Sequence, residues 1–464
     1  MDHVRCGVAG LDQRIHADRL LVSVNAAIRR VGRNPLPEGA ISIGVGLVLA
    51  GLTQYGFLAV AAHALGPVRY APLATFWALL FVCGPGFFLP LEQEVGRAMA
   101  ARRTRGEGGR PLVARASVAG AALAVCLIVP SALAAGPIAA RLFRGDTVLV
   151  WALVAGLLAF CIEYLARGTL AGNGRFGPYG LLLGSEGVLR VAFCVALAVA
   201  GAAAAGVYGL ALVAGTFLSV AVALAGRHGL LRPGPRAAWS ELSSALGFLL
   251  IASVLTQFLL SIGTVAVQLL ATPAEQAAAG RFLTSRIVAY VPIFLFQAVQ
   301  FALLPKLSAL AARGHHGEFR SVLGQLLLFV AGLGAISIVA LAALGPFITH
   351  LLFGGGFELG HLDFALLAAS CTLFMVAQVL SQALISLSAY VRVAAGWIAG
   401  AAVFVVGTAL GKQLFLRVEV GLLAGSIATV VLMAALLVPL LRSRAAEGID
   451  AEALVAAVPP VVEI

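Results

Sequence analysis

Long apolar segments alternate with short polar segments along most of this chain. Between residues 40 and 441, runs of mostly apolar residues follow one another, each near the length of about 20 residues that a helix needs to cross about 30 Å of hydrocarbon. The pattern predicts an all-α polytopic membrane protein. We predict twelve membrane-spanning helices, at residues 41–63, 70–92, 112–135, 148–170, 179–200, 205–226, 243–270, 277–304, 320–344, 362–388, 393–412 and 420–441.

The composition agrees with this pattern. Of 464 residues, 61% are hydrophobic and 11% are charged, whereas soluble domains have about 25% charged residues. The six cysteines include no CxxC pair, which favours small buried apolar residues over a disulfide or a metal site. No glycine-rich run follows a strand and opens a helix, so no nucleotide-binding loop is predicted.

The basic residues are distributed unevenly between the two sides of the predicted membrane. The net charge is +11, and if the amino terminus is cytoplasmic, most arginines fall in cytoplasmic tails and loops. This bias follows the positive-inside rule and predicts a bacterial cell-membrane protein with both termini in the cytoplasm. It explains the charge without a nucleic-acid partner. Residues 1–39 are basic and have no apolar core of signal-peptide length, so we expect a cytoplasmic tail there.

Similar segments recur in the same order in the two halves. AGPIAARLFRGD at 135–146 resembles LGPFITHLLFGGG at 344–356, and GLTQYGF at 51–57 resembles VLTQFLL at 254–260. This recurrence predicts two parallel six-helix repeats, and in transporters built this way the substrate binds between the lobes. We expect a basic tail at 1–39, an N-lobe at 40–226, a cytoplasmic linker at 227–241, a C-lobe at 242–441 and a short cytoplasmic tail at 442–464.

Two Glu–Arg pairs lie in predicted spans of the N-lobe. Glu163 and Arg167 are four residues apart, as are Glu186 and Arg190. Residues at this spacing share a helical face, so each pair can neutralise its charges away from water. The pairs either lock helices together or take part in binding, and we expect a functional role for Glu186 and Arg190 before the secondary pair Glu163 and Arg167.

Polar residues also follow two stripes in the C-lobe, each within about 80° on a helical face. The stripe in the seventh span is Ser253, Gln257, Ser261, Thr264 and Gln268, and that in the eighth is Arg286, Tyr290, Gln297 and Gln300. Such stripes line a cavity or bond to neighbouring helices, but Arg286 is harder to explain as a helix–helix contact. Arg281 lies off this face. His350, Glu358, His361 and Asp363, near the external end of the tenth span, favour a solvated loop over a cation site or gate.

The motifs also resemble a known superfamily. The segments RGTLAGNGRFGPYGLLLGSEGVLR and FLPLEQEVGRAMAARR, together with the Gly-Pro elements before the fourth and tenth spans, are similar to the multidrug/oligosaccharidyl-lipid/polysaccharide exporter superfamily. Within it, the chain is most similar to actinobacterial polysaccharide-biosynthesis membrane proteins of the flippase branch. This resemblance implies two lobes around a central cavity and alternating access. It also implies movement of an undecaprenyl-pyrophosphate-linked glycan to the external leaflet, for cell-surface polysaccharide biosynthesis.

The resemblance implies an eighth-span arginine that binds substrate, and Arg286 is the nearest match. The first span has no charged residue at its centre, a departure from lipid II flippases that argues against lipid II as substrate. We expect a transporter rather than an enzyme, with no catalytic residue, metal or cofactor. Na⁺ and H⁺ are the candidate coupling ions, at an unassigned site. Candidate substrate-binding residues are Arg286, Arg190, Glu186, Tyr290, Gln257, Gln297 and Arg281. Expected partners are the lipid-linked glycan, membrane lipids, and glycan polymerases or glycosyltransferases around a monomeric chain.

Three other functions remain open from the sequence. A cation-coupled multidrug exporter of the same superfamily would need unpaired acids in its cavity, whereas the N-lobe acids are spaced to pair with arginines. A membrane glycosyltransferase or polymerase would need a long external loop with acidic residues, and the external connections here are short. A scaffold that recruits partners through the basic tail is the third.

Overall fold

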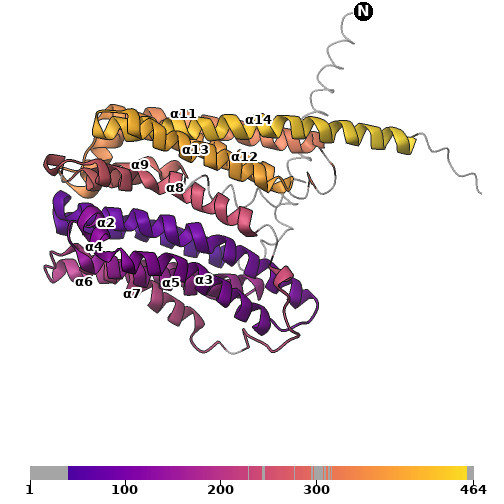
Figure 1. Cartoon of the computed structure of the whole chain (residues 1–464), viewed down its shortest axis with the longest axis horizontal. Coiled ribbons are helices and arrows are strands. Elements are labelled where there is room, and N and C mark those ends of the chain that lie inside the picture. Colours follow the sequence, from indigo (N-terminus) through magenta and orange to yellow (C-terminus); the bar gives the residue numbers. More distant parts are fainter. Residues whose placement is uncertain are drawn as a thin grey trace, which may run out of the picture.

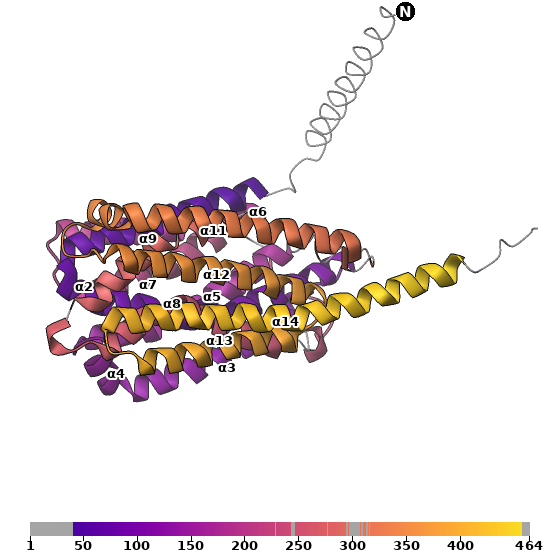
Figure 2. The same cartoon turned by 90° about the horizontal axis from the view of Figure 1, so that it is seen from above.

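The computed structural model describes residues 40–456 except 228, 243–245, 276, 294–295, 297–306, 308–309, 312–313 and 315, with side chains from Ser42 to Arg442. The predicted tail at 1–39 lies outside the described residues. The described segments are helices joined by short connections, and their long axes run roughly parallel (Figures 1 and 2). In Figure 1 the helices of the N-terminal half, indigo to magenta, form one group, and those of the C-terminal half, pink to yellow, form the other.

The N-terminal group consists of α2 (Ala40–Thr104), α3 (Arg110–Leu133), α4 (Ala135–Leu142), α5 (Thr147–Gly172), α6 (Phe176–Val199) and α7 (Ala205–Leu224). The C-terminal group consists of α8 (Leu246–Leu270), α9 (Ala278–Ala289), α11 (His316–Phe353), α12 (His361–Ser386), α13 (Tyr390–Leu410) and α14 (Leu414–Ala456). Two 3₁₀ turns, η1 (Trp239–Glu241) and η2 (Pro273–Glu275), lie in the connections. These two groups are the N-lobe and the C-lobe.

Ten helices among the described residues are long and apolar enough to cross a membrane. Helix α2 contains two of the predicted spans, because its 65 residues include a kink at Gly66, where φ is 67° and ψ is 168°. Glycine adopts such a φ without steric cost, and Pro67 follows it directly. The predicted span 277–304 begins with α9, and most of its remainder lies outside the described residues. The all-helical, polytopic architecture with two lobes agrees with the prediction.

The bend in α2 lies at one end of the molecule. We call the end that contains Gly66 the kink end, and the opposite end, where the connection between the lobes lies, the linker end. The first half of α2 packs against α6, and α2 also packs against α5 and, across the lobes, against α8 and α9. Helix α2 is therefore the element that joins the two lobes.

The two Gly-Pro elements that align in sequence differ in structure. In the N-lobe, α3 ends at Leu133 and AGPIAARL forms the separate helix α4, whereas in the C-lobe α11 continues through Pro346 to Phe353. The N-lobe segment carries two prolines, Pro130 and Pro137. Each proline removes one backbone donor and crowds the preceding turn, so two within eight residues interrupt a helix that a single proline leaves continuous.

The connection between the lobes is bound to the N-lobe at the linker end. Arg102, near the end of α2, is 2% exposed. Its guanidinium donates to both carboxylate oxygens of Glu241 at 2.7 and 2.9 Å, and to the carbonyl oxygens of Gly108 and Pro235, both at 3.0 Å. Paired bonds of this kind between arginine and a carboxylate are among the stronger polar contacts in proteins. Arg102 therefore fixes the predicted linker to the N-lobe.

The hydrogen bond from Arg102 lowers the pKa of Glu241 to about 2. A carboxyl whose folded pKa is depressed stabilises the fold above its unfolded pKa, and this contribution is lost as the pH falls through the folded value. We predict that Glu241→Gln lowers stability by about 1–3 kcal/mol at neutral pH. The difference from wild type should shrink between about pH 4.5 and about pH 2. Thermal unfolding of the purified protein across this pH range measures it.

Glu107→Gln is the matched control for this prediction. Glu107 lies at the same end of the N-lobe and pairs with Arg105 at 3.0 Å, but the arginine side chain is 52% exposed. Exposed pairs contribute about 0–1 kcal/mol, so this variant should unfold near the wild-type temperature. Equal losses in both variants would contradict the anchoring role of Arg102 and Glu241.

Candidate functional site

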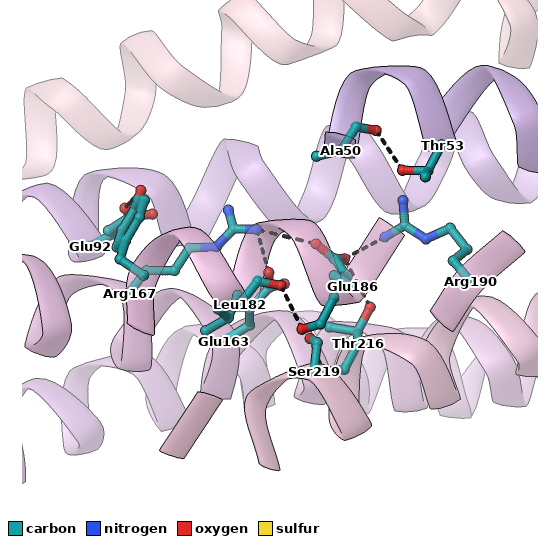
Figure 3. A network of polar contacts seen from close by, with 12 residues as sticks. Ala50, Thr53, Glu92, Glu163, Arg167, Leu182, Glu186, Arg190, Thr216 and Ser219 are labelled. Atoms are coloured by element: carbon teal, nitrogen blue, oxygen red, sulfur yellow. Dashed lines mark hydrogen bonds and ion pairs between the residues drawn. The ribbon is translucent and has the colours of Figure 1, made fainter. Parts of the chain in front are cut away.

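Charged side chains from α5 and α6 form one buried network in the N-lobe (Figure 3). Arg167 forms ion pairs with Glu163 and, at 3.3 Å, with Glu186. Glu186 also pairs with Arg190 and accepts a hydrogen bond of 3.1 Å from Thr216 on α7. Both pairs predicted at a spacing of four residues are present, and Arg167 joins them. The network therefore connects three helices.

The charges of this network balance one another. It contains two glutamates and two arginines, and Glu163, Glu186 and Arg190 are all buried. The Arg167 guanidinium lies over the ring of Tyr164 at 4.9 Å. Burial of charges costs several kcal/mol per ion unless partners replace the lost water, and aromatic faces contribute attraction to the cations. The arrangement accounts for four charged side chains inside an otherwise apolar lobe.

The helices around the network approach one another closely at glycine residues. A Cβ on Gly187 would lie 1.9 Å from Thr53 Oγ1 of α2, and a Cβ on Gly215 of α7 would lie 3.2 Å from the backbone nitrogen of Arg190. Small residues at helix contacts allow backbones in membrane proteins to approach closely. Arg190 reaches across this contact, so that its guanidinium lies 5.6 Å from the ring centroid of Trp77 on α2.

Glu92 and Glu94 both lie close to Arg97 in the sequence, but only Glu94 forms an ion pair with it among the described residues. Arg97 donates to Glu94 at 2.8 Å. Glu92 is buried and accepts a hydrogen bond of 2.8 Å from the Tyr179 hydroxyl of α6. The contact joins residues 87 positions apart, which no helical spacing reveals. Thr216 was missed for the same reason.

Arg286 is a buried cation in the C-lobe with a different environment. It lies on α9 and donates to the carbonyl oxygen of Leu260 on α8, which also accepts a bond of 2.9 Å from the Tyr290 hydroxyl. The Arg286 guanidinium lies over the Tyr290 ring at 4.9 Å. No carboxylate pairs with Arg286 among the described residues. The positive charge on Arg286 is therefore not neutralised by an acid in this part of the chain.

Polar groups near Arg286 also have no partners. The Nε atom of Arg286 and the hydroxyls of Ser285 and Tyr70 are buried without hydrogen bonds to the described residues. Tyr70 comes from α2 of the opposite lobe. Buried polar groups in proteins are usually hydrogen-bonded. Unused donors beside an unpaired arginine are typical of a site that binds an anionic or polar ligand.

The polar stripe predicted for the seventh span lies on α8, and two of its residues make contacts between the lobes. Gln257 donates from Nε2 to the carbonyl oxygen of Phe81 at 3.3 Å, and Ser253 donates to that of Pro85 at 3.3 Å. Pro85 has no N–H, so the carbonyl of Phe81 four residues earlier lacks its helical donor. The alternative of interhelical hydrogen bonding therefore describes Ser253 and Gln257 in this conformation. Substrate binding by Gln257 stays a prediction.

The remaining candidates fall in three places. Arg281 is partly buried, and its guanidinium lies 5.5 Å from the ring centroid of Phe415. Gln297 lies outside the described residues. His350 pairs with Glu358, while the His361 ring contacts the carbonyl oxygen of Ala342 at 2.7 Å. The bond with His350 lowers the pKa of Glu358. No group of three metal-ligating side chains occurs among the described residues.

A separate groove of about 780 Å³ lies on the N-lobe, away from the arginines described above. It lies between α3, α5 and α7, and Leu230 and Leu231 of the linker form part of its wall. Its lining is mainly apolar, with Arg227 at one edge. Nothing in its chemistry matches the predicted site.

No family model matches the chain. Among curated proteins, an uncharacterized protein of Mycobacterium tuberculosis is 24% identical over 425 residues, covering 89% of this chain and 95% of the relative. An uncharacterized protein of Mycobacterium bovis is 24% identical over 421 residues, covering 86% of this chain and 92% of the relative. These relatives extend over nearly the whole chain but carry no functional assignment.

Solved structures with the same fold are transporters. An inward-facing multidrug resistance MATE family transporter of the MOP superfamily matches with a TM-score of 0.67 and 11% identity, covering 87% of this chain and 99% of the other. A MOP superfamily transporter from Pyrococcus furiosus, described as having a binding pocket of reverse polarity that suggests a different function, matches with a TM-score of 0.63 and 12% identity, covering 87% and 96%. The chain is therefore a polytopic membrane protein with the fold of MATE transporters.

The N-lobe network gives a prediction about stability. Replacing Glu186 by Leu leaves Arg190 buried without its partner and should cost about 3–5 kcal/mol. The double variant Glu186→Leu with Arg190→Met removes both charges and should lose less than the single variant. Thermal unfolding of the two single variants and the double variant, as a double-mutant cycle, measures the coupling. Additive losses would show that the pair contributes no coupling.

Proposed function

We propose that this chain moves a polyprenyl-pyrophosphate-linked oligosaccharide from the cytoplasmic to the external leaflet of a bacterial cell membrane by alternating access. The moved glycan serves cell-surface polysaccharide biosynthesis. The MATE-like fold supports an exporter of the MOP superfamily, since two lobes around a shared axis suit alternating access. The proposed substrate class rests on the charges inside the lobes.

The unpaired charge of Arg286 carries the proposal. A lipid-linked glycan presents a diphosphate that must leave water while its prenyl tail remains in lipid. Arginine suits this group because its planar guanidinium stays charged and donates paired hydrogen bonds to phosphate oxygens. Arg286 lies at the face of α9 near α2, so an anion bound there would lie between the two lobes. In our proposal Arg286 is the first contact of the diphosphate.

The other candidates take secondary roles. Arg190 is held by Glu186 in this structure, so it binds the diphosphate only when that pair opens, and Glu186 competes for Arg190 when the cavity is empty. Tyr290 and Gln257 receive sugar hydroxyls once their present bonds to backbone carbonyls are released. Arg281, and Gln297 outside the described residues, remain further candidate contacts of the substrate. The neutral polar side chains of α8, among them Ser261, Thr264 and Gln268, would offer further hydrogen-bonding groups to the sugars.

The alternative of a cation-coupled multidrug exporter is less well supported. A pocket for cationic drugs needs an acid without a counter-ion facing the cargo. In the N-lobe, Glu163 and Glu186 are bound to arginines. Arg286, on the C-lobe helix that contacts α2, has no acid partner among the described residues. The Pyrococcus furiosus transporter with its pocket of reverse polarity provides a precedent for a change of pocket charge on this fold.

We predict that Arg286→Gln blocks transport while leaving the protein folded. Loss of a charge-assisted hydrogen bond costs about 1.5–3 kcal/mol, which corresponds to about a tenfold to a 150-fold loss of transport. Undecaprenyl-linked glycan on the cytoplasmic leaflet should accumulate, as in a deletion strain. Inverted vesicles and intact cells, compared at equal expression, measure the leaflet distribution. Arg286→Lys should retain intermediate activity because the charge remains.

Arg141→Gln is the control, because Arg141 is an exposed arginine of the N-lobe. This variant should transport the substrate at the wild-type rate. If the deletion strain accumulates no lipid-linked glycan but becomes sensitive to cationic compounds, the multidrug function replaces the proposed one. Arg286 would then be a structural partner of Leu260 and Tyr290.

A further inference from the structure

The apolar groove between α3, α5 and α7 runs from the linker end of the N-lobe toward its middle. At the linker end it is lined by Val113 near the start of α3, Thr169 near the end of α5 and Arg227 just beyond α7. Its lining on α3 ends at Ala124, which is 11 residues beyond Val113, so the groove is about 16 Å long. This length matches the hydrocarbon of one leaflet, which is half of about 30 Å.

The groove opens on the outside of the N-lobe. Helices α3, α5 and α7 are long and apolar enough to cross a membrane and pack against other helices of the N-lobe. In Figure 1 they lie on the side of α2 away from the C-lobe. Leu158 and Ile162 in the groove are 45% and 39% exposed. Side chains of this kind on membrane-spanning helices contact lipid tails, which are as apolar as leucine.

Backbone bonds hold the linker in place as one wall of the groove. Leu230 and Leu231 belong to its lining. The Asn173 side chain at the end of α5 donates from Nδ2 to the carbonyl oxygen of Leu230 at 3.3 Å, and the N–H of Arg110 donates to that of Arg232 at 3.1 Å. The groove is therefore already formed in this structure. Its volume of about 780 Å³ lies within the range of roughly 300–1,000 Å³ that is typical of ligand sites.

Two arginines lie at the linker end of the groove. Arg227 lines its edge, and its Nε donates to the carbonyl oxygen of Ala223 at 2.7 Å. Arg110 is exposed and precedes Val113 by three residues and Ser117 by seven, so it shares the face of α3 that lines the groove. No acid among the described residues forms an ion pair with either arginine. An apolar groove with positive charge at one end is complementary to a ligand with an apolar tail and an anionic head.

We propose that the groove binds one anionic glycerophospholipid from the leaflet at the linker end. An acyl chain lies between α3, α5 and α7, and the phosphate lies at Arg110 and Arg227. Basic pockets between membrane-spanning helices bind anionic headgroups, and arginine can donate paired hydrogen bonds to a phosphate. The hydroxyl of Thr169 donates to the carbonyl oxygen of Leu165 at 2.8 Å, so it leaves no unsatisfied donor against the acyl chain.

The bound lipid contacts both the N-lobe helices and the linker, so it stabilises their packing. A ligand that binds only the folded state raises the free energy of unfolding. Phosphatidylglycerol should therefore raise the unfolding temperature more than phosphatidylcholine with the same acyl chains. This role is separate from Arg286 and does not depend on which cargo is carried.

Native mass spectrometry of the full chain in detergent, with phosphatidylglycerol or phosphatidylcholine of identical acyl chains, tests the proposal. We expect the wild type to bind one phosphatidylglycerol in preference to phosphatidylcholine. Arg110→Gln and Arg227→Gln should each weaken the binding of phosphatidylglycerol about fivefold, with no change for phosphatidylcholine. Arg103→Gln is the matched control, because Arg103 is an exposed arginine at the same end that does not line the groove. This variant should bind phosphatidylglycerol as the wild type does.

A second pair of variants tests the position of the acyl chain. Ala121 lines the groove and is exposed, whereas its neighbour Ala122 is exposed outside it. Ala121→Trp should fill the groove and abolish the preferred binding, while Ala122→Trp should retain it, and thermal unfolding checks that both are folded.

Four results would overturn the proposal. The first is equal binding of the two phospholipids by the wild type, and the second is equal losses in Arg227→Gln and Arg103→Gln or equal retention in the two tryptophan variants. The third is displacement of the bound phosphatidylglycerol by equimolar undecaprenyl pyrophosphate, which would assign the groove to that lipid. The fourth is a wild-type dimer that is lost in Ala121→Trp, which would assign the groove to a second copy of the chain.

Discussion

The cost of a charge away from water governs the interior of this protein. Each lobe contains buried arginines, and the lobes solve the problem differently. In the N-lobe, Glu163, Arg167, Glu186 and Arg190 neutralise one another in one network. In the C-lobe, Arg286 has a backbone carbonyl and an aromatic ring but no acid among the described residues. The charges balance in the first arrangement, whereas the second leaves a positive charge that an anion could neutralise.

The contacts between the lobes are of a different strength. Tyr55 donates to Ile287 at 3.3 Å, and Ser253 and Gln257 donate to carbonyl oxygens of α2. Each such neutral bond contributes about 0.5–1.5 kcal/mol net, far less than a buried ion-pair network. The N-lobe is therefore held together by stronger polar interactions than those that join it to the C-lobe, and the contacts between the lobes can break and re-form. This difference in strength is what a rigid-body movement between two states requires.

The sequence was sufficient for the all-helical, two-lobed architecture and the two Glu–Arg pairs, because hydropathy and helical spacing are local properties. It did not reveal that Arg167 contacts Glu186, since that contact depends on how α5 packs against α6. It also gave no sign that the second Gly-Pro element stays helical, because the difference arises from Pro130 in the other copy.

The anchored linker limits how the lobes can move. Arg102 holds Glu241 against the N-lobe, and only residues 243–245 separate Leu242 from the first residue of α8. At about 3.3–3.6 Å per residue, the start of α8 stays within roughly 14 Å of Leu242 in any state. This short connection keeps the first residue of α8 close to the N-lobe, whereas it places no such limit on the opposite end of the C-lobe. The short connection and the Arg102–Glu241 ion pair together restrain the relative position of the lobes at the linker end. A rotation of one lobe against the other would therefore move the helices most at the kink end.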